Sequence, residues 1–346
     1  MRIVIVGASV AGNYAALKLA SRFEVEVFEE HASIGLPAHC TGIITKDLFE
    51  FLPKRKEWIL NKFKACELIA NKKKLEIPLN EYAIDRIKFD LWLGEKAQAK
   101  GAIFNLNHRF LAIKNDFAIF KTNSRIKKKK FDILIGADGA NSSVAKSVGL
   151  WGDRKFYIGA QKLIKGFYDR KKYIINLCKP SDFFTWLAPI NEHHAWYGSA
   201  SKKEFLKFKD GKNVRAAPMP IYKKIPIQTN NIYLTGAAAL LVKASTGGGI
   251  ISSIKSSHAL AKALSNGSPY EKEIKDLRRS LFFHYLIRKT LNKFTPNDYD
   301  RLLEILSNAE VKKIFLEQSR EKLPDLFFKL FLAQPKLLRF LPKIII

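Results

Sequence analysis

Short apolar runs that end at glycine recur along this chain of 346 residues and predict buried strands. Three of them cover residues 1–6, 131–135 and 232–235. The segment 24–28 gives a further strand, and helical spacing follows over 13–22 and 250–264. Strands that alternate with helices in this way predict an α/β fold around a parallel sheet.

The loop after the first strand carries a pattern of glycines. Residues 7–12 form a variant of G-x-G-x-x-G from Gly7 to Gly12, and Asn13 opens the helix behind it. Gly7 permits a tight turn, and the N–H groups at the helix N-terminus favour a pyrophosphate. Glu29, 22 residues after Gly7, ends the next strand where an acid binds a ribose hydroxyl. Ser9 replaces the second glycine, and its hydroxyl is able to bond a phosphate oxygen. The order predicts a dinucleotide site; a strand-turn-helix without a nucleotide is the alternative.

Composition adds a basic charge balance and few cysteines. Lys and Arg number 60 against 32 Asp and Glu, a formal net charge of +28, which attracts nucleic acid or an anionic bilayer face. Basic runs at 72–74 and 127–130 are most simply solvated loops. Three irregularly spaced cysteines argue against a disulfide framework or a zinc site and fit a reducing cytoplasm. No uncharged stretch reaches the ~20 residues of a membrane span. We expect a cytoplasmic protein of two or three packed domains with no metal site.

Two later segments favour FAD over a nicotinamide cofactor. Residues 136–144 resemble the G-A-D-G-x-x-S-x-V segment of FAD-dependent hydroxylases and their reductase relatives, which implies that the Asp138 turn lies near the ribose and pyrophosphate. Residues 85–93 resemble the D-R-x-x-F-D-x-x-L helix start of the same flavoproteins, which implies that Arg86 points at the cofactor. Without these motifs Asp138 would be an ordinary turn residue and Arg86 a surface cation.

A third segment of this kind follows the strand at 232–235. Residues 236–251 resemble the G-D-A-A-G…T-G-G-G-I stretch by which the same flavoproteins close their FAD site. The resemblance places Gly248, Gly249 and Ile250 at the isoalloxazine ring, where bare backbone N–H groups stabilise negative charge on a reduced flavin. Ala237 stands where the pattern has Asp, and Leu240 where it has Gly. We therefore expect weaker FAD affinity than is usual for the group.

Two segments narrow the resemblance to the geranylgeranyl reductase family, which saturates isoprenoid double bonds. Residues 34–43 are similar to the family's I-G-x-P-x-x-C loop, which implies that Cys40 and Thr41 lie beside the flavin ring. Residues 184–189 are similar to its aromatic-x-W-x-F-P segment on the substrate sheet, with Ala188 in place of Phe. The resemblance runs from residue 1 to about 265.

The residue types in these two segments suit reduction of an isolated C=C bond. That reaction needs a dry site for hydride transfer and a proton for the second carbon. Cys40 is the candidate proton donor or flavin gate, with His39 as a second donor; the alternative is that Cys40 only packs. Phe184 and Trp186 have the period-2 spacing that puts both on one strand face. With Pro189 they would line a prenyl tunnel, or else simply pack the sheet.

The C-terminal third carries no motif of the family. From residue 270 the pattern is helical, with Thr295 and Pro296 as a helix start. Over 326–346, apolar residues up to Ile346 alternate with Lys329, Lys336, Arg339 and Lys343. This suits either an amphipathic helix in the interface of an anionic membrane or a helix that covers the substrate tunnel.

Together these features predict an FAD-binding α/β domain of the doubly wound, glutathione-reductase or hydroxylase type over residues 1–65, 83–150 and 226–266. An antiparallel-sheet substrate domain is expected over 66–82 and 151–225, and a helical segment over 267–346. We expect an FAD-dependent oxidoreductase that reduces a prenyl lipid at a membrane surface, with NAD(P)H or a ferredoxin as electron donor. An FAD monooxygenase on the same fold, an RNA-associated flavoprotein and a cofactor-poor relative are the alternatives. Nucleic-acid binding rests on net charge alone, and the sequence does not indicate an oligomeric state.

Overall fold

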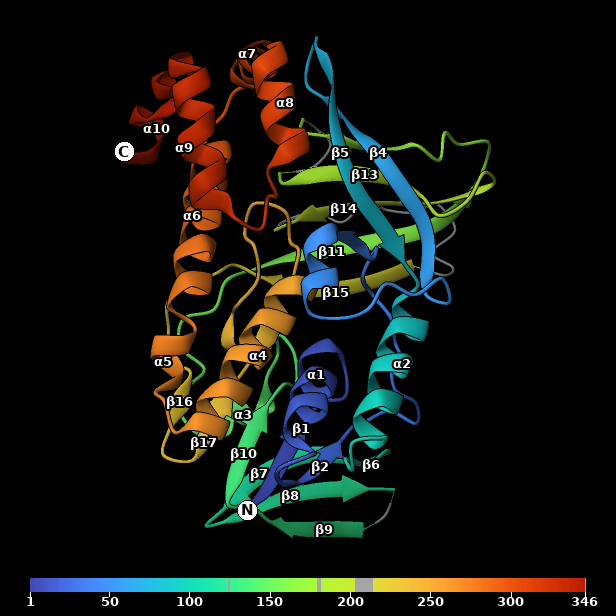
Figure 1. Cartoon of the computed structure of the whole chain (residues 1–346), viewed down its shortest axis with the longest axis vertical. Coiled ribbons are helices and arrows are strands. Elements are labelled where there is room, and N and C mark those ends of the chain that lie inside the picture. The colour runs from blue at the N-terminus through green and yellow to red at the C-terminus, as the bar shows by residue number, and fades with distance from the viewer. Residues whose placement is uncertain (124, 179–181, 203–213, 346) are drawn as a thin grey trace. The chain divides into compact units, whose positions relative to one another are not determined.

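The chain forms two compact units in the computed structural model, which describes residues 1–123, 125–178, 182–202 and 214–345 (Figure 1). The first unit contains the described residues of Met1–Ala38, Arg86–Lys155 and Pro220–Leu281. The second unit contains the described residues of His39–Asp85, Phe156–Met219 and Phe282–Ile346. Ile346 itself, the end of the expected C-terminal apolar segment, lies outside the described residues.

A six-stranded sheet with a parallel centre forms the core of the first unit, in the order β16-β17-β10-β1-β2-β6. Its strands are β1 (Arg2–Val6), β2 (Glu24–Phe28), β6 (Ile103–Asn105), β10 (Ile133–Gly136), β16 (Gln228–Thr229) and β17 (Ile232–Leu234). Ile3 of β1 pairs in parallel with Val25 of β2 and with Ile133 of β10. β1 and β10 are almost wholly buried, which is why they are nearly continuous apolar runs. The expected α/β fold around a parallel sheet is confirmed, with β16 as an antiparallel edge.

Helix α1 (Val10–Leu19) lies between α2 (Arg86–Gln98) and α4 (Ile250–Asn266) (Figure 1). It begins three residues before the helix expected over 13–22. Gly12 lies in the first turn of α1, at a position where no side chain fits. A Cβ on Gly12 would lie 1.9 Å from the Gly7 carbonyl oxygen. A glycine that reads as loop in the sequence is therefore part of the helix.

The connection from β6 to β10 is a small antiparallel sheet. It consists of β7 (Arg109–Lys114), β8 (Phe117–Thr122) and β9 (Arg125–Lys130). Phe120 on β8 is fully buried and stacks on Phe28 of β2, with ring centroids 4.1 Å apart. The doubly wound pattern thus holds at β1-α1-β2 but not at this connection. The basic run 127–130, expected as a loop, is part of β9, since its backbone pairs with β8 while most of its lysines face solvent.

Leu240 shows how the loop after β17 is built without the glycine that the flavoprotein pattern has there. It follows the 3-10 helix η2 (Gly236–Ala239) and adopts φ 58°, in the left-handed region. An L-residue in this region is strained by about 1–2 kcal/mol. The side chain is nevertheless fully buried, so the position combines backbone strain with a gain from packing.

Replacing Leu240 with glycine is expected to lower the free energy of unfolding by about 1–3 kcal/mol, because the lost burial outweighs the relieved strain. Chemical denaturation followed by circular dichroism measures the change. The matched control is Asn230→Gly, since Asn230 has φ 49° on an exposed turn and its replacement relieves strain without loss of burial. A Leu240→Gly variant as stable as the parent would mean that strain, not packing, dominates at this position.

An eight-stranded sheet forms most of the second unit, in the order β15-β11-β14-β13-β12-β4-β5-β3. Its strands are β3 (Ile43–Thr45), β4 (Ile59–Ile69), β5 (Lys74–Ile84), β11 (Phe156–Lys165), β12 (Lys172–Asn176), β13 (Phe184–Pro189), β14 (His194–Ser201) and β15 (Val214–Pro220). β12 runs parallel to β4, and the pairs β4–β5, β11–β14 and β13–β14 are antiparallel. Residues 39–65 were expected in the FAD domain. They lie in this unit because β3 and most of β4 pair with β5.

Helices complete the second unit at its C-terminal end. They are the end of α6 (Lys275–Leu291), α7 (Pro296–Leu306), α8 (Ala309–Glu317), α9 (Leu323–Ala333), the 3-10 helix η3 (Pro335–Phe340) and α10 (Pro342–Ile345). The expected helix start is confirmed, because Thr295 and Asp298 form a capping box on α7. Leu326, Leu330 and Leu337 share a buried cluster with Leu75 and Ile77 of β5. Among the described residues, no helix has the length and apolar character needed to cross a membrane.

Candidate active site

Three loops that follow the parallel strands β1, β10 and β17 meet around the N-terminus of α1. Gly7 has φ 103°, and a Cβ there would lie 2.6 Å from the Ala137 carbonyl oxygen in the loop after β10. A Cβ on Gly236, which follows β17, would lie 2.9 Å from the Cβ of Ala11. The structure therefore brings Gly7, Ala137 and Gly236, one residue from each of the three motifs, close to the start of α1 at the carboxyl edge of the sheet, where α/β folds bind their ligands.

The N-terminus of α1 fits an anionic group. Ser9 is its N-cap, and the Ser9 side chain makes no capping hydrogen bond to the first turn. Gly12 adds no side chain over the N–H groups of this turn. An uncapped helix N-terminus behind a glycine turn presents free N–H donors and a positive dipole end. The residues present therefore fit the pyrophosphate of a dinucleotide.

Ser9 is held by an ion pair of helix α2. Its Oγ donates to Asp90 Oδ2 at 2.8 Å and accepts from Arg86 Nη2 at 3.2 Å. Arg86 Nη2 also donates to Asp90 Oδ2 at 2.8 Å, so Arg86 lies beside the glycine turn. Asn13 is fully buried and donates through Nδ2 to the Asp90 carbonyl at 2.9 Å, which joins α1 to α2. In this arrangement the Ser9 hydroxyl is directed to a carboxylate, and Asn13 faces the helix contact.

Glu29 is tied back to the glycine turn from the end of β2. Its Oε2 accepts from the Ala8 N–H at 2.8 Å, and its Oε1 accepts from the His31 N–H at 3.0 Å. Oε1 also pairs with His31 Nδ1 at 2.6 Å. The acid that the sequence predicts at a ribose is therefore fixed beside the same turn as Gly7.

Asp138 builds the turn of the second motif. Its Oδ1 accepts from Ser142 Oγ at 2.6 Å, and its Oδ2 accepts from the Val144 N–H at 3.0 Å. Ser142 caps α3 (Ser143–Ser147) by accepting from the Ala145 N–H. Burial raises the pKa of Asp138, against the opposing effect of these hydrogen bonds. The spacing of this motif therefore has a local structural reason in addition to any contact with a cofactor.

The third motif contains a buried lysine that the sequence analysis missed. Lys243 is 5% exposed, and its Cε would lie 2.9 Å from a Cβ on Gly248. Its backbone N–H donates to the Gly248 carbonyl, so the loop closes on itself before α4 begins at Ile250 with Gly249 as an N-cap that offers no side chain. A single lysine inside the apolar stretch 237–244 was the available signal. Ala237 is half-buried in η2.

In the second unit, Gln161 joins the loop of Cys40 to the strand of Trp186. This buried residue of β11 accepts through Oε1 from Thr41 Oγ1 at 2.6 Å and from Trp186 Nε1 at 3.3 Å. Its Nε2 donates to the His39 carbonyl at 2.9 Å. The sequence analysis missed Gln161, for which a lone amide in an alternating strand was the only signal. The structure thus connects the Cys40 loop and the Trp186 strand, whose proximity could not be predicted from the sequence.

Cys40 itself is exposed on this loop. Its Sγ accepts from the Gly42 N–H at 3.3 Å. Gly42 has φ 82°, and a Cβ there would lie 2.3 Å from the Ile84 carbonyl oxygen, so the backbone after Cys40 is closely packed on β5. The thiol is therefore accessible on a loop whose backbone is well fixed.

Phe184 and Trp186 share one face of β13, as expected. Their ring centroids are 6.0 Å apart in an edge-to-face arrangement. Trp186 pairs with Gly198 of β14, where a Cβ would lie 2.4 Å from the indole, so the ring covers the neighbouring strand. Pro189 ends β13 in a buried position, and its carbonyl accepts from Asn61 Nδ2 at 3.1 Å.

The fold and the site define a class of protein first. Solved structures of flavin-dependent enzymes, halogenases among them, share this fold. No family model matches the chain. The class is that of FAD-dependent oxidoreductase folds.

Within this class the likeness is to geranylgeranyl reductases. The chain is 25% identical over 372 residues to the geranylgeranyl diphosphate reductase of Synechocystis, with 91% of this chain and 90% of that protein covered. It is 33% identical over 190 residues to the chloroplastic enzyme of Nicotiana tabacum, a match that covers 46% of this chain and 40% of that protein. A solved structure from Thermoplasma acidophilum, described as geranylgeranyl bacteriochlorophyll reductase-like, superposes with a TM-score of 0.86 at 22% identity over 99% of both chains. The resemblance expected from the motifs is confirmed.

Proposed function

We propose that this protein is an FAD-dependent oxidoreductase that reduces C=C bonds of a prenyl lipid. The observation that carries the proposal is the meeting of three glycine-bearing loops at the uncapped N-terminus of α1. The likeness to the Synechocystis reductase, which extends over nine-tenths of both chains, supports the choice of substrate class. Bound FAD would supply the hydride that the reaction requires.

The first unit would hold the cofactor through groups at this sheet edge. The free N–H groups of α1 would donate hydrogen bonds to the pyrophosphate, and Gly7 and Gly12 would leave room for it. Glu29 would accept a hydrogen bond from a ribose hydroxyl. Arg86 would add positive charge beside the pyrophosphate, and Asp138 would shape the neighbouring turn. The backbone of Gly248, Gly249 and Ile250, together with the buried Lys243 side chain, would stabilise negative charge on the reduced ring.

The second unit would bind the substrate and provide the proton. Phe184 and Trp186 present aromatic faces from one strand, which suits a flat apolar chain, and Pro189 closes the end of that strand. Cys40 would deliver a proton to the second carbon or gate access to the flavin, with Thr41 fixing its loop through Gln161. Exclusion of water around these groups would keep the hydride from other reactions.

Two measurements on the purified protein test the proposal. Protein prepared with excess FAD is expected to retain flavin absorption in the visible range after gel filtration. Its reduced form is expected to be reoxidised under anaerobic conditions by a prenyl lipid, with a saturated product. Absence of bound flavin would contradict the proposed function. Reoxidation that needs oxygen would indicate a monooxygenase instead. Reduction by NAD(P)H or by a ferredoxin in the same apparatus identifies the electron donor.

Restoring the missing carboxylate at position 237 is expected to tighten FAD by about 10-fold, the effect of one hydrogen bond to a charged group. Ala237 is half-buried beside Gly236, so an Asp side chain is able to reach solvent or cofactor. Equilibrium titration of flavin fluorescence compares Ala237→Asp with Ala237→Asn, which has the same shape without the charge. Unchanged or weaker affinity in both variants would show that the local site has been rebuilt around alanine.

We further propose that the C-terminal helices bind an anionic membrane surface. Phe328 and Leu332 of α9 are 67% and 66% exposed, and Leu338 and Leu341 are exposed on the segment that follows. Lys329, Lys336 and Arg339 are exposed beside them. The fourth expected cation, Lys343, instead pairs with Asp298. Apolar side chains edged by basic residues suit the interface of a bilayer, where each cation adds about 1 kcal/mol.

Sedimentation with vesicles tests the membrane proposal. Binding is expected to vesicles that contain phosphatidylglycerol and to fall at least 10-fold in a Phe328→Ser, Leu332→Ser variant. An Ile103→Ser, Leu111→Ser variant, which removes exposed apolar residues of the first unit, is the control. Salt-sensitive binding to transfer RNA, with none to vesicles, would support an RNA-associated flavoprotein instead.

A further inference from the structure

A buried arginine of the first unit joins two of the loops that meet at the start of α1. Arg154 lies in the segment after α3 and is 9% exposed. Its Nη1 donates to the Ala140 carbonyl of the second motif at 3.2 Å. Its Nη2 donates to the Ala238 carbonyl, in η2 of the third motif, at 2.8 Å. One guanidinium group therefore ties the loop after β10 to the loop after β17.

The segment that carries Arg154 fixes the rest of the guanidinium. Nε donates to the Trp151 carbonyl at 2.7 Å, and Nη2 also donates to the Leu150 carbonyl at 3.5 Å. The guanidinium carbon lies 4.3 Å from the centre of the Trp151 ring, which is within the range of a cation–π contact. The side chain is thus held from its own segment, and its planar fork is directed at the two loops.

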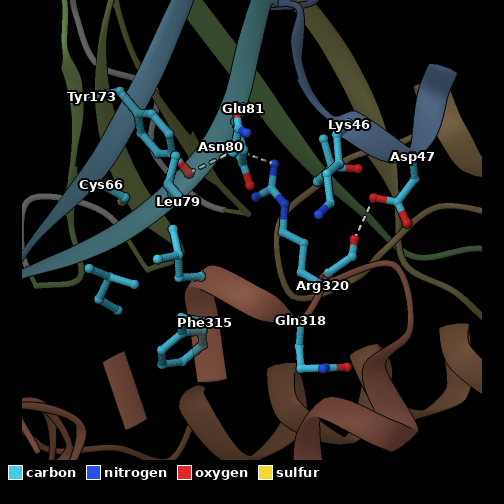
Figure 2. A pocket seen from close by; sticks show the side chains of 14 residues that line it. Lys46, Asp47, Cys66, Leu79, Asn80, Glu81, Tyr173, Phe315, Gln318 and Arg320 are labelled. Carbon is cyan, nitrogen blue, oxygen red and sulfur yellow. Dashed lines mark hydrogen bonds and ion pairs between the residues drawn. The ribbon is translucent and has the colours of Figure 1, made fainter. Parts of the chain in front are cut away.

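Every hydrogen-bond acceptor of Arg154 in the described part of the chain is a backbone carbonyl. The adjacent acid, Asp153, pairs instead with Lys223 at 3.0 Å. Arg320 of the second unit shows the more usual arrangement, in which Nη2 pairs with the Glu81 carboxylate at 2.9 Å beside a cavity (Figure 2). Arg154 is therefore a buried cation held by neutral groups.

The charge of Arg154 persists in its buried position. Burial lowers its pKa to about 10, and the charge of Asp138 opposes this effect, so the side chain stays protonated at neutral pH. Carbonyl oxygens satisfy the donors of a cation but carry no net charge to compensate it. A buried cation of this kind favours an anionic ligand at the loops that it joins, and a pyrophosphate is such a ligand.

The two contacts with the loops also orient peptide groups. In a trans peptide the N–H points away from the C=O. Because the carbonyls of Ala140 and Ala238 face Arg154, the N–H groups of Asn141 and Ala239 point away from it. The spacing of the two loops and the direction of their N–H groups therefore depend on one side chain.

We propose that Arg154 is a positioning residue of the cofactor site, which holds the loops after β10 and β17 in the arrangement that binds an anionic dinucleotide. The inference rests on the proposed function, since that function assigns the dinucleotide to these loops. Asp138 and Ala237 lie within the motifs themselves, whereas Arg154 lies outside them and acts through the backbone of both. Lysine is not equivalent here, because an ammonium group lacks the planar fork that reaches both loops.

Equilibrium titration of flavin fluorescence tests the inference with Arg154→Lys and Arg154→Ala. Both variants are expected to bind FAD at least 10-fold more weakly than the parent, since lysine keeps the charge but loses the fork. Millimolar guanidinium chloride is expected to tighten FAD in Arg154→Ala by occupying the vacated site, and the same concentration of sodium chloride is not. Arg22→Lys, at an exposed arginine of the same unit, is the control.

Two results of this titration would overturn the inference. Parental FAD affinity in a folded Arg154→Lys variant would show that the fork does not position the loops. Equal tightening of FAD by the two salts in Arg154→Ala would assign the effect to ionic strength rather than to the guanidinium group. Circular dichroism shows whether each variant is folded, and Arg154→Lys, the milder change, decides the question if Arg154→Ala does not fold.

Amide hydrogen exchange of the cofactor-free protein, followed by mass spectrometry, tests the positioning role without FAD. Exchange is expected to be at least 10-fold faster in Arg154→Lys over residues 136–142 and 236–241. The C-terminal helices of this variant, and both loops of Arg22→Lys, are expected to exchange at the parental rate, which separates a local effect from general destabilisation. Parental exchange in both loops of Arg154→Lys would overturn the inference even if the parent binds FAD. A parent that binds no flavin, together with faster exchange in the variant, would contradict the proposed function alone, so the two failures are distinguishable.

Discussion

Single-turnover reoxidation of the reduced protein by a prenyl substrate is expected to slow by about 100-fold when Cys40 is replaced by alanine. The thiol is exposed on a loop whose backbone is fixed by Gly42 and Gln161, so its removal changes chemistry more than packing. Anaerobic stopped-flow absorbance follows the reoxidation directly. Flavin retention in the same samples separates a slower reaction from loss of cofactor.

Two further variants identify what the thiol does. Cys40→Ser keeps a donor of similar size with a higher pKa, so it is expected to fall between the parent and Cys40→Ala if proton donation matters. Cys178→Ala, at a partly buried cysteine of the same unit, is the matched control and is expected to react at the parental rate. A parental rate in Cys40→Ala would mean that Cys40 only packs. His39 or water would then be the candidate proton donor.

FAD binding is expected to weaken at least 100-fold, a loss of about 3 kcal/mol, when Gly12 is replaced by alanine. The new Cβ would lie 1.9 Å from the Gly7 carbonyl oxygen, so the turn or the first residues of α1 must move. Either movement misplaces the N–H donors that fit a pyrophosphate. Equilibrium dialysis with FAD measures the affinity.

The control for Gly12→Ala is Lys18→Ala, an exposed change on the same helix that leaves the turn unaltered. Circular dichroism shows whether each variant is folded. A folded Gly12→Ala protein with parental FAD affinity would contradict the placement of the pyrophosphate at α1. That result would shift attention to α4, whose N-cap Gly249 also offers no side-chain cap.

The order of the strands and glycine turns could be predicted from the sequence because each depends on local chemistry. A buried parallel strand needs a continuous apolar run, and a turn at φ 103° needs glycine, so β1, Gly7 and β10 are legible directly. The same local logic identified Thr295 as a helix cap and put Phe184 and Trp186 on one face.

The features that the sequence analysis missed depend on contacts between distant segments. The role of Gln161 becomes visible only in the folded protein, where β11 pairs with β14 and contacts the Cys40 loop. Residues 39–65 read as an extension of the FAD domain because strand pairing with β5 leaves no mark in their own pattern. Asn13 is predicted as a cofactor residue from its place in a motif, and nothing in that motif indicates that its Nδ2 also donates to the Asp90 carbonyl where α1 packs on α2.

The single amide of Gln161 makes Trp186 and the Cys40 loop dependent on each other. Loss of the indole N–H, as in Trp186→Phe, would remove one of the two donors to a buried oxygen and loosen its hold on Thr41. Under the roles proposed for Trp186 and Cys40, changes at Trp186 that suit a different substrate chain length would also alter the Cys40 loop, and their effects would not add to those of changes at Thr41. Evolution of substrate range in this protein would then pass through paired substitutions, with each position constraining which residues the other can accept.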